Sequence, residues 1–194
     1  MFDADGQRLK VLILQIGELP PKVLESIANY LPSVFPNTQC EPMAIRFPLP
    51  WEAFDALRKQ FDSSKILSKI SKLSIKEDHR ILGVTNLDLF VQGMNFVFGQ
   101  AQLGGKVALI SIYRLKPEFY GDKPNESLLQ ERCVKEAIHE VGHTLGLTHC
   151  PNHRCVMTFS NNIFMVDAKS KRFCEPCRRF VLERMDLLFK NMKS

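Results

Sequence analysis

The stretch of sequence that decides the fold is His139-Glu140-Val141-Gly142-His143-Thr144-Leu145-Gly146-Leu147-Thr148-His149. Because His139 and His143 are four residues apart, a helix places both imidazoles on one face, where they can bind one zinc ion. Gly146 can adopt a positive φ, so a sharp turn there can bring His149 back as a third ligand. Three protein ligands leave a fourth position for water, which is typical of a catalytic zinc site.

Glu140 projects about 100° around the helix from His139. From there it can reach a water on the metal without being a ligand itself. The alternative is a helix that carries surface histidines and a chance glycine. With the residue frequencies of this chain, the whole pattern arises by chance with a probability on the order of 10⁻⁵. The motif therefore predicts a catalytic zinc site.

A second group of candidate metal ligands follows directly. Cys174 and Cys177 form a C-x-x-C pair, and Cys150 and Cys155 are separated by four residues. Two close pairs joined by a longer loop are typical of a tetrahedral zinc site. Two alternatives stay open, in which His153 replaces one thiolate or the four cysteines form disulfides.

The apolar pattern outside the motif predicts an α/β fold with a mixed sheet. The turn at Gly104 and Gly105 predicts a hairpin, in which the strands on either side of it are antiparallel. Ser127, with Gln130 three residues later, resembles a capping box that begins the motif helix, which should end at Gly146. We expect strands at 10–16, 40–49, 80–90, 96–102 and 107–113, helices at 23–30, 63–73 and 127–145, and a final helix that begins near Pro176.

The extended motif HExxHxxGxxH is that of the metzincin zinc peptidases. Its continuation through Cys150, Cys155, Met157, Cys174 and Cys177 resembles the archaemetzincin family. The segments 83–90, 95–101 and 111–115 are also similar to that family, so the resemblance spans nearly the whole chain.

This resemblance implies a metzincin-like fold of the α/β (α+β) class. Its twisted, mixed sheet has an antiparallel edge strand. An active-site helix and a C-terminal helix follow the sheet, and a structural zinc ion would join the segment after the first of these helices to the start of the second. Residues 1–194 would form a single catalytic domain, with the sheet in about 1–120 and the zinc-binding part in about 125–194. A peptide substrate would pair with the edge strand, for which 96–102 is the candidate.

The resemblance also implies two zinc ions per chain. The catalytic zinc would be held by His139, His143 and His149, with Glu140 as the base. The structural zinc would be held by Cys150, Cys155, Cys174 and Cys177. Met157 matches the methionine beneath the catalytic metal, although a simple core-filling role predicts the same burial.

The function that we expect is hydrolysis of peptide bonds in peptide or protein substrates. Zinc would lower the pKa of its bound water, and Glu140 would take a proton from that water and deliver it to the leaving amine. One alternative is a zinc-stabilised binding module that uses the basic C-terminal helix. Another is a weakly active metzincin scaffold with a covered cleft.

Composition limits the other possibilities. The chain has 194 residues, of which 45% are hydrophobic and 24% charged, as in a globular protein of about one domain. No apolar run approaches the ~20 residues of a membrane helix, and 11–16 reads as a strand. The segment 169–194 carries the whole net charge of +5, but acids interrupt its bases, so we do not expect nucleic-acid binding. We expect a cytoplasmic monomer that does not bind membranes.

Overall fold

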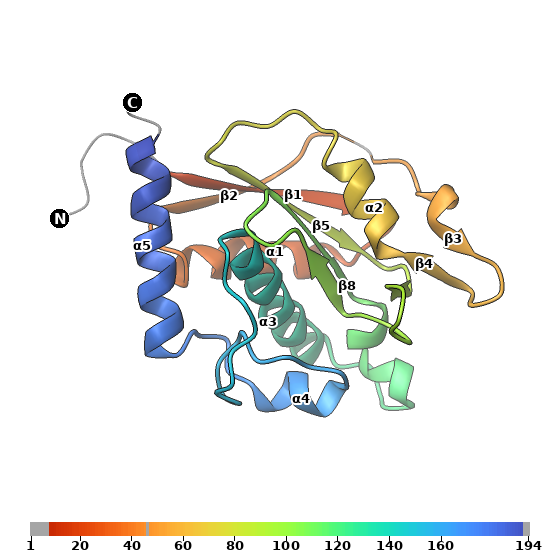
Figure 1. Cartoon of the computed structure of the whole chain (residues 1–194). Coiled ribbons are helices and arrows are strands. Elements are labelled where there is room, and N and C mark those ends of the chain that lie inside the picture. The colour runs from red at the N-terminus through yellow and green to blue at the C-terminus, as the bar shows by residue number, and fades with distance from the viewer. Residues whose placement is uncertain (1–7, 46, 192–194) are drawn as a thin grey trace.

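The centre of the molecule is a five-stranded sheet with the strand order β2-β1-β5-β8-β7 (Figure 1). This is seen in a computed structural model that describes residues 8–45 and 47–191. Four of the strands are parallel, and β7 pairs antiparallel with β8 at the edge. The predicted mixed sheet with an antiparallel edge strand is therefore confirmed. The strands are β1 (Leu9–Ile16), β2 (Thr38–Pro42), β5 (His79–Thr85), β7 (Gly99–Ala101) and β8 (Val107–Ser111).

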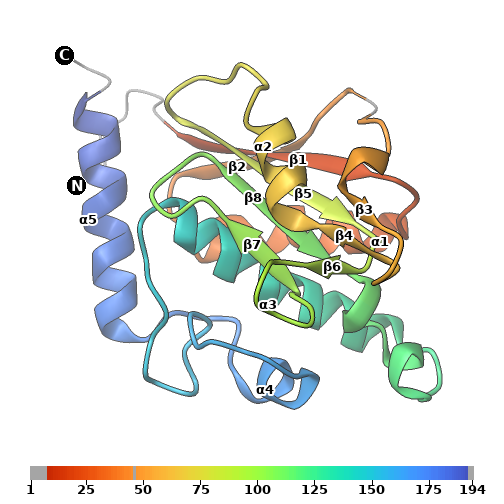
Figure 2. The ribbon, with the colours of Figure 1, turned by 45° about the vertical axis from the view of Figure 1, so that its right-hand side comes forward.

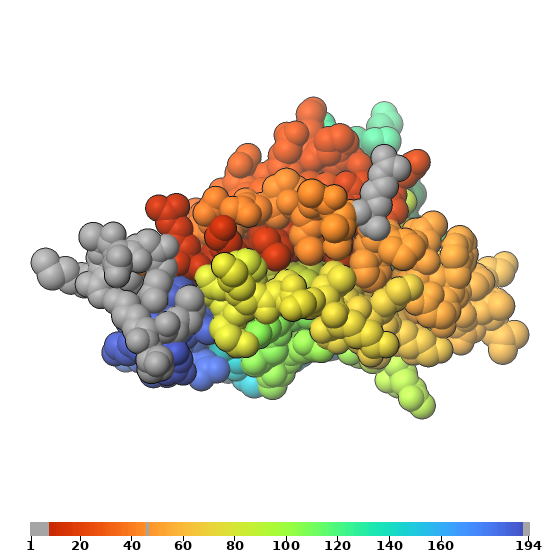
Figure 3. Space-filling view, turned by 90° about the horizontal axis from the view of Figure 1, so that it is seen from above, coloured from red at the N-terminus to blue at the C-terminus, as the bar shows by residue number. Residues whose placement is uncertain are grey.

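Helices cover both faces of this sheet (Figure 2). On one face lie α1 (Pro21–Tyr30) and α3 (Glu126–Thr144), and on the other lies α2 (Ser63–Ile70). The short helix α4 (Ile163–Ala168) contacts α3, and α5 (Glu175–Asn191) stands at one end of the sheet, at the left of Figure 1 and Figure 3. Because both faces are covered, the inner strands are apolar on both sides, and all five residues of β8 are buried.

The period of two along a strand divides the apolar side chains between two clusters. On β8, Ala108 and Ile110 join the cluster beneath α1 and α3, whereas Val107 and Leu109 join the cluster beneath α2. The larger cluster contains Cys133, which is fully buried. The three residues of β7, in contrast, are only half-buried, so one edge of the sheet remains accessible.

Several predicted strands are longer than the observed ones. The expected strand 96–102 shortens to β7 (Gly99–Ala101) and 107–113 shortens to β8 (Val107–Ser111), and two others differ further. The expected strand 80–90 is interrupted by a polar turn, where the Ser111 hydroxyl donates to Leu87 O (2.5 Å) and Leu87 N donates to Thr85 Oγ1 (3.3 Å). The last two residues of the expected strand, 89–90, belong instead to a small second sheet, which is visible at the right of Figure 1. That sheet contains β3 (Phe54–Asp55), β4 (Gln60–Asp62) and β6 (Leu89–Phe90).

The expected strand 40–49 is also too long. The strand β2 ends at Pro42, and Met43 N donates one last hydrogen bond to Ile13 O of β1 (2.9 Å). Beyond it, Phe47 makes a single parallel bridge with Ile16, and Arg46 lies outside the described residues. Helix α4 was not predicted. It begins after Asn162, whose side chain accepts a hydrogen bond from Met165 N (3.0 Å).

The predicted capping box at Ser127 is wrong. The N-cap of α3 is Asn125, whose side-chain oxygen accepts a hydrogen bond from Leu128 N at 3.0 Å. Ser127 lies inside the first turn instead. The other end of the helix is as predicted, because the chain leaves it at Gly146 with φ of +98°. Within the described ranges no helix is both long and apolar enough to cross a membrane.

The N-cap correction is directly testable. Asn125→Ala should lower the free energy of unfolding by about 1 kcal/mol, because the N–H of Leu128 loses its acceptor. Ser127→Ala is the matched control and should have little effect. Urea denaturation of both variants measures the difference, and an equal loss from both would contradict the assigned cap.

Candidate active site and metal centres

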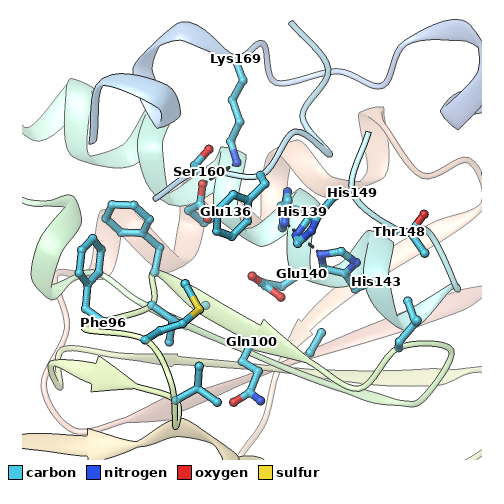
Figure 4. A pocket seen from close by; sticks show the side chains of 18 residues that line it. Phe96, Gln100, Glu136, His139, Glu140, His143, Thr148, His149, Ser160 and Lys169 are labelled. Carbon is cyan, nitrogen blue, oxygen red and sulfur yellow. Dashed lines mark hydrogen bonds and ion pairs between the residues drawn. The ribbon is translucent and has the colours of Figure 1, made fainter. Parts of the chain in front are cut away.

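The structure brings three imidazoles to one point beside α3 (Figure 4). His139 and His143 come from consecutive turns of the helix, and His149 comes from the segment after Gly146. The Nε2 atoms of His139 and His143 are 3.0 Å apart, and one ring nitrogen from each of the three lies within 4.8 Å of the others. These are the three residues that the motif predicts as catalytic zinc ligands.

Two backbone carbonyls orient the helical pair. The Nδ1 of His139 is 2.8 Å from Val156 O, and the Nδ1 of His143 is 2.6 Å from Leu147 O. When each Nδ1–H donates to its carbonyl, each Nε2 is left as a free donor atom for a metal. Burial lowers the pKa of His139 well below its usual value, and the pKa values of His143 and His149 are lowered for the same reason. The imidazoles are therefore held neutral, which is the form that binds zinc.

The turn at Gly146 makes this arrangement possible. Gly146 N donates to His143 O (2.9 Å) and Leu147 N donates to Gly142 O (3.2 Å), which closes the helix end. The chain then runs back along α3, so that Leu147 O reaches His143 and His149 faces the other two histidines.

Glu140 lies between the histidines and the edge of the sheet (Figure 4). It lines a cavity of about 350 Å³ that the three histidines also line, and only 5% of its surface is exposed. Burial raises the pKa of Glu140 well above its usual value, and the negative charge of Glu136 adds to this, whereas Lys169 opposes it. A carboxyl group with a raised pKa can both accept and donate a proton near neutral pH.

Gly99 is a site residue that the sequence analysis missed. A Cβ at this position would lie 2.7 Å from Glu140 Oε1 and 2.8 Å from Leu109 O, so only glycine allows β7 to pass so close to Glu140. Phe98 O and Gln102 N bond to β8, so by alternation the backbone groups of Gly99 point away from β8. Nothing in the sequence pattern marks this contact, because the two residues are distant in the chain.

Met157 is fully buried beneath the motif helix. A Cβ at Gly142 would lie 2.7 Å from Met157 Sδ, so this glycine leaves room for the methionine against the motif helix. The two interpretations of Met157, a floor beneath the metal and a core filler, both predict this burial.

The four cysteines of the second group also converge. The Sγ atoms of Cys150, Cys155, Cys174 and Cys177 all lie within 4.8 Å of one another, and those of Cys150 and Cys174 are 3.6 Å apart. Four thiolates at about 2.3 Å from a zinc ion would be about 3.8 Å apart, so the set fits tetrahedral zinc. All four are free thiols, so the disulfide alternative is wrong. His153 is exposed and lies outside the cluster.

The two groups share one short segment of backbone. Cys150 directly follows His149, and Cys150 N donates to Met157 O (2.9 Å). The carbonyl of Val156, which orients His139, directly follows Cys155. The cysteine cluster therefore holds in place both the third histidine and the carbonyl that orients the first.

Comparisons with known proteins agree on one family. The sequence matches the profile of peptidase family M54 over residues 14–184. It is 41% identical over 176 residues to an archaemetzincin of Methanocaldococcus jannaschii, covering 91% of this chain and 94% of the relative. It is 43% identical over 178 residues to an archaemetzincin of Pyrococcus abyssi, covering 87% and 92%.

Solved structures show the same fold. The crystal structure of an archaemetzincin from Methanopyrus kandleri superimposes with a TM-score of 0.84 at 31% identity, covering 95% of this chain and 99% of that chain. A zinc-dependent peptidase from Methanocorpusculum labreanum gives 0.80 at 32% identity, covering 88% and 99%.

The shared backbone predicts that damage to the cysteine cluster reaches the histidines. Cys174→Ser should weaken zinc binding at both groups, because the segment that carries His149 and Val156 loses its anchor. Competition with a coloured chelator measures both affinities. Cys133→Ser, a buried cysteine away from the cluster, is the control, and an unchanged affinity of the histidine site in Cys174→Ser would contradict the coupling.

Proposed function

Because this chain belongs to peptidase family M54, the archaemetzincins, it is a zinc-dependent metallopeptidase, and we propose that Glu140 is its general base. His139, His143 and His149 hold the catalytic zinc in this proposal. The observation that carries it is the convergence of three neutral imidazoles and a buried carboxylate on one cavity beside an open strand edge.

The donor atoms fit this assignment, since both helical imidazoles turn their Nε2 atoms away from the carbonyls that hold Nδ1. Zinc bound there would lower the pKa of a water toward ~7 and polarise the substrate carbonyl. Glu140 takes the proton from the attacking water. It then donates that proton to the leaving amine, and its raised pKa supports this second role.

The cysteine cluster has a different role in this proposal. Four thiolates would fill the coordination sphere of a second zinc and leave no position for water, so that ion would be structural. It would fix the chain after His149 to the start of α5, where Cys177 lies.

The edge strand β7 supplies the peptide-binding surface. The backbone groups of Gly99 and Ala101 point away from β8 and line the cavity next to Glu140. An extended peptide can pair with them by adding a strand to the sheet, which places its backbone beside the catalytic groups. Main-chain pairing selects a polypeptide without selecting its sequence.

The alternative function, a binding module that uses the basic C-terminal helix, has less support. Arg178 pairs with Glu175 at 3.0 Å, and Arg184 Nε donates to Leu145 O at 3.1 Å. Two bases of α5 therefore already have partners within the chain.

The general base is tested by Glu140→Gln. This change should lower turnover by about 10²–10⁴-fold, because the amide cannot take a proton from water. The zinc content should be unchanged, since Glu140 is not a ligand. Peptide cleavage followed by mass spectrometry, with metal analysis of the same sample, gives both readouts. Turnover at the unaltered rate would reject this role for Glu140.

The contact between the edge strand and the base is tested by Gly99→Ala. The added methyl group meets Glu140 and the backbone of β8, so turnover should fall by about 10²-fold while zinc is retained. Gly83→Ala is the matched control, because its methyl group crowds side-chain ends of Leu109 and Ile70 in the core and meets the backbone, at Ala108 O, only at an ordinary 3.5 Å. The control should lose stability and keep its turnover, and equal turnover in both variants would refute the contact.

A further inference from the structure

Three buried polar atoms without a hydrogen-bond partner gather on one wall of the active-site cavity. They are Lys169 Nζ, Glu136 Oε1 and Ser160 Oγ, and all three residues line the cavity with Glu140 (Figure 4). In the described part of the chain, the fourth such side-chain atom is the Nε of Arg80, which is not in this lining. Buried polar groups of folded proteins are nearly always hydrogen-bonded, so a cluster of three beside a catalytic site calls for a ligand.

Lys169 and Glu136 form an ion pair that water does not reach. Their Nζ and Oε1 atoms are 2.8 Å apart, and the side chains are 0% and 4% exposed. The contact lacks the geometry of a hydrogen bond. Lys169 Nζ can therefore still donate a hydrogen bond to a further group, and Glu136 Oε1 can still accept one. Burying two charges is costly even when they are paired, so this arrangement gains from any further polar partner.

The neighbouring contacts prevent this pair from turning out into solvent. On the same two elements, Arg132 makes two hydrogen bonds to the Asp167 carboxylate (2.8 and 2.7 Å), and Lys135 Nζ donates to Asp167 O (3.0 Å). These bonds fix the end of α4 against α3. The polar wall is therefore preorganised, which lowers the entropic cost of binding a group there.

We propose that this wall is a specificity subsite for a substrate side-chain carboxamide, that of glutamine or asparagine. The inference rests on the proposed peptidase function. The amide oxygen accepts a hydrogen bond from Lys169 Nζ, and the amide NH₂ donates to Glu136 Oε1 or to the hydroxyl of Ser160. Phe96 and Phe98, which also line the cavity, provide apolar walls for the methylene groups.

Other side chains fit the wall less well. A carboxylate would face the negative charges of Glu136 and Glu140, and an ammonium group would face Lys169. An apolar side chain would give no hydrogen bond to Lys169 Nζ, Glu136 Oε1 or Ser160 Oγ, and sites built for hydrogen bonding discriminate strongly against such analogues. A neutral group that both donates and accepts is the one chemistry that matches.

The direction of the edge strand places this residue in the substrate. Figure 4 shows Glu136, Ser160 and Lys169 on the side of the histidines where Phe96 lies, at the N-terminal end of β7. A peptide that pairs antiparallel with β7 runs toward that end. The carboxamide therefore belongs to a residue on the C-terminal side of the cleaved bond.

Binding of zinc-anchored hydroxamates tests the subsite without requiring turnover. Four peptidic hydroxamates would carry, on the C-terminal side of the zinc-binding group, the side chain of glutamine, glutamate, methionine or lysine. Isothermal titration of the zinc-loaded full chain should give about 10-fold or more tighter binding for the glutamine compound than for each of the others. Equal affinity of the glutamine and methionine compounds would overturn the inference.

Two double variants locate the effect. Glu136→Met/Lys169→Met replaces the ion pair with apolar side chains of similar volume and should bring the ratio of glutamine to methionine affinity to about 1. The control, Lys106→Met/Glu77→Met, removes an ion pair (2.6 Å) that lies outside the cavity lining and should keep the wild-type ratio. An unchanged ratio in the first variant would overturn the subsite. Failure of all four compounds to bind would reject the histidine zinc site itself, and the subsite with it.

Discussion

The hydrogen bond between His139 Nδ1 and Val156 O is the interaction on which the rest of the site depends. Both helical imidazoles turn Nε2 toward one point because each Nδ1 meets a backbone carbonyl that lies outside the helix. The chain must therefore reverse after α3 and return along it. Gly146 permits the reversal, and Leu147 O and Val156 O are the two acceptors that the returning segment delivers.

The returning segment has little regular structure of its own between Gly146 and α4, so other contacts must hold it. The cysteine cluster does so on one side, by joining this segment to the start of α5. The ion pairs from α3 to Asp167 and Lys169 do so on the other. This division explains why α3 buries charged residues, such as Arg132 and Glu136, as well as the motif. One face of the helix packs on the sheet, and another holds the wall of the cavity.

The sequence predicted those parts of the molecule that depend on local spacing. The histidines, the two cysteine pairs and the apolar runs of β1 and β8 are local patterns, and the structure brings the first two groups together as expected. Local secondary-structure propensity did not reveal three other features, because they depend on which polar groups meet after folding. These features are the cap at Asn125, the small second sheet and helix α4. The same is true of Gly99, whose lack of a side chain matters only because Glu140 lies against it. The wall formed by Glu136, Ser160 and Lys169 joins segments that no motif connects.

We infer that the histidine cluster and the cysteine cluster each hold a zinc ion, one for catalysis and one for the backbone that positions it. Zinc per chain, measured by mass spectrometry on protein purified without chelator or added metal, tests this most directly. We expect two zinc ions in the unaltered chain and one in His143→Ala. A single zinc ion in the unaltered chain that survives His143→Ala would contradict it, because only the cysteine cluster would then bind metal.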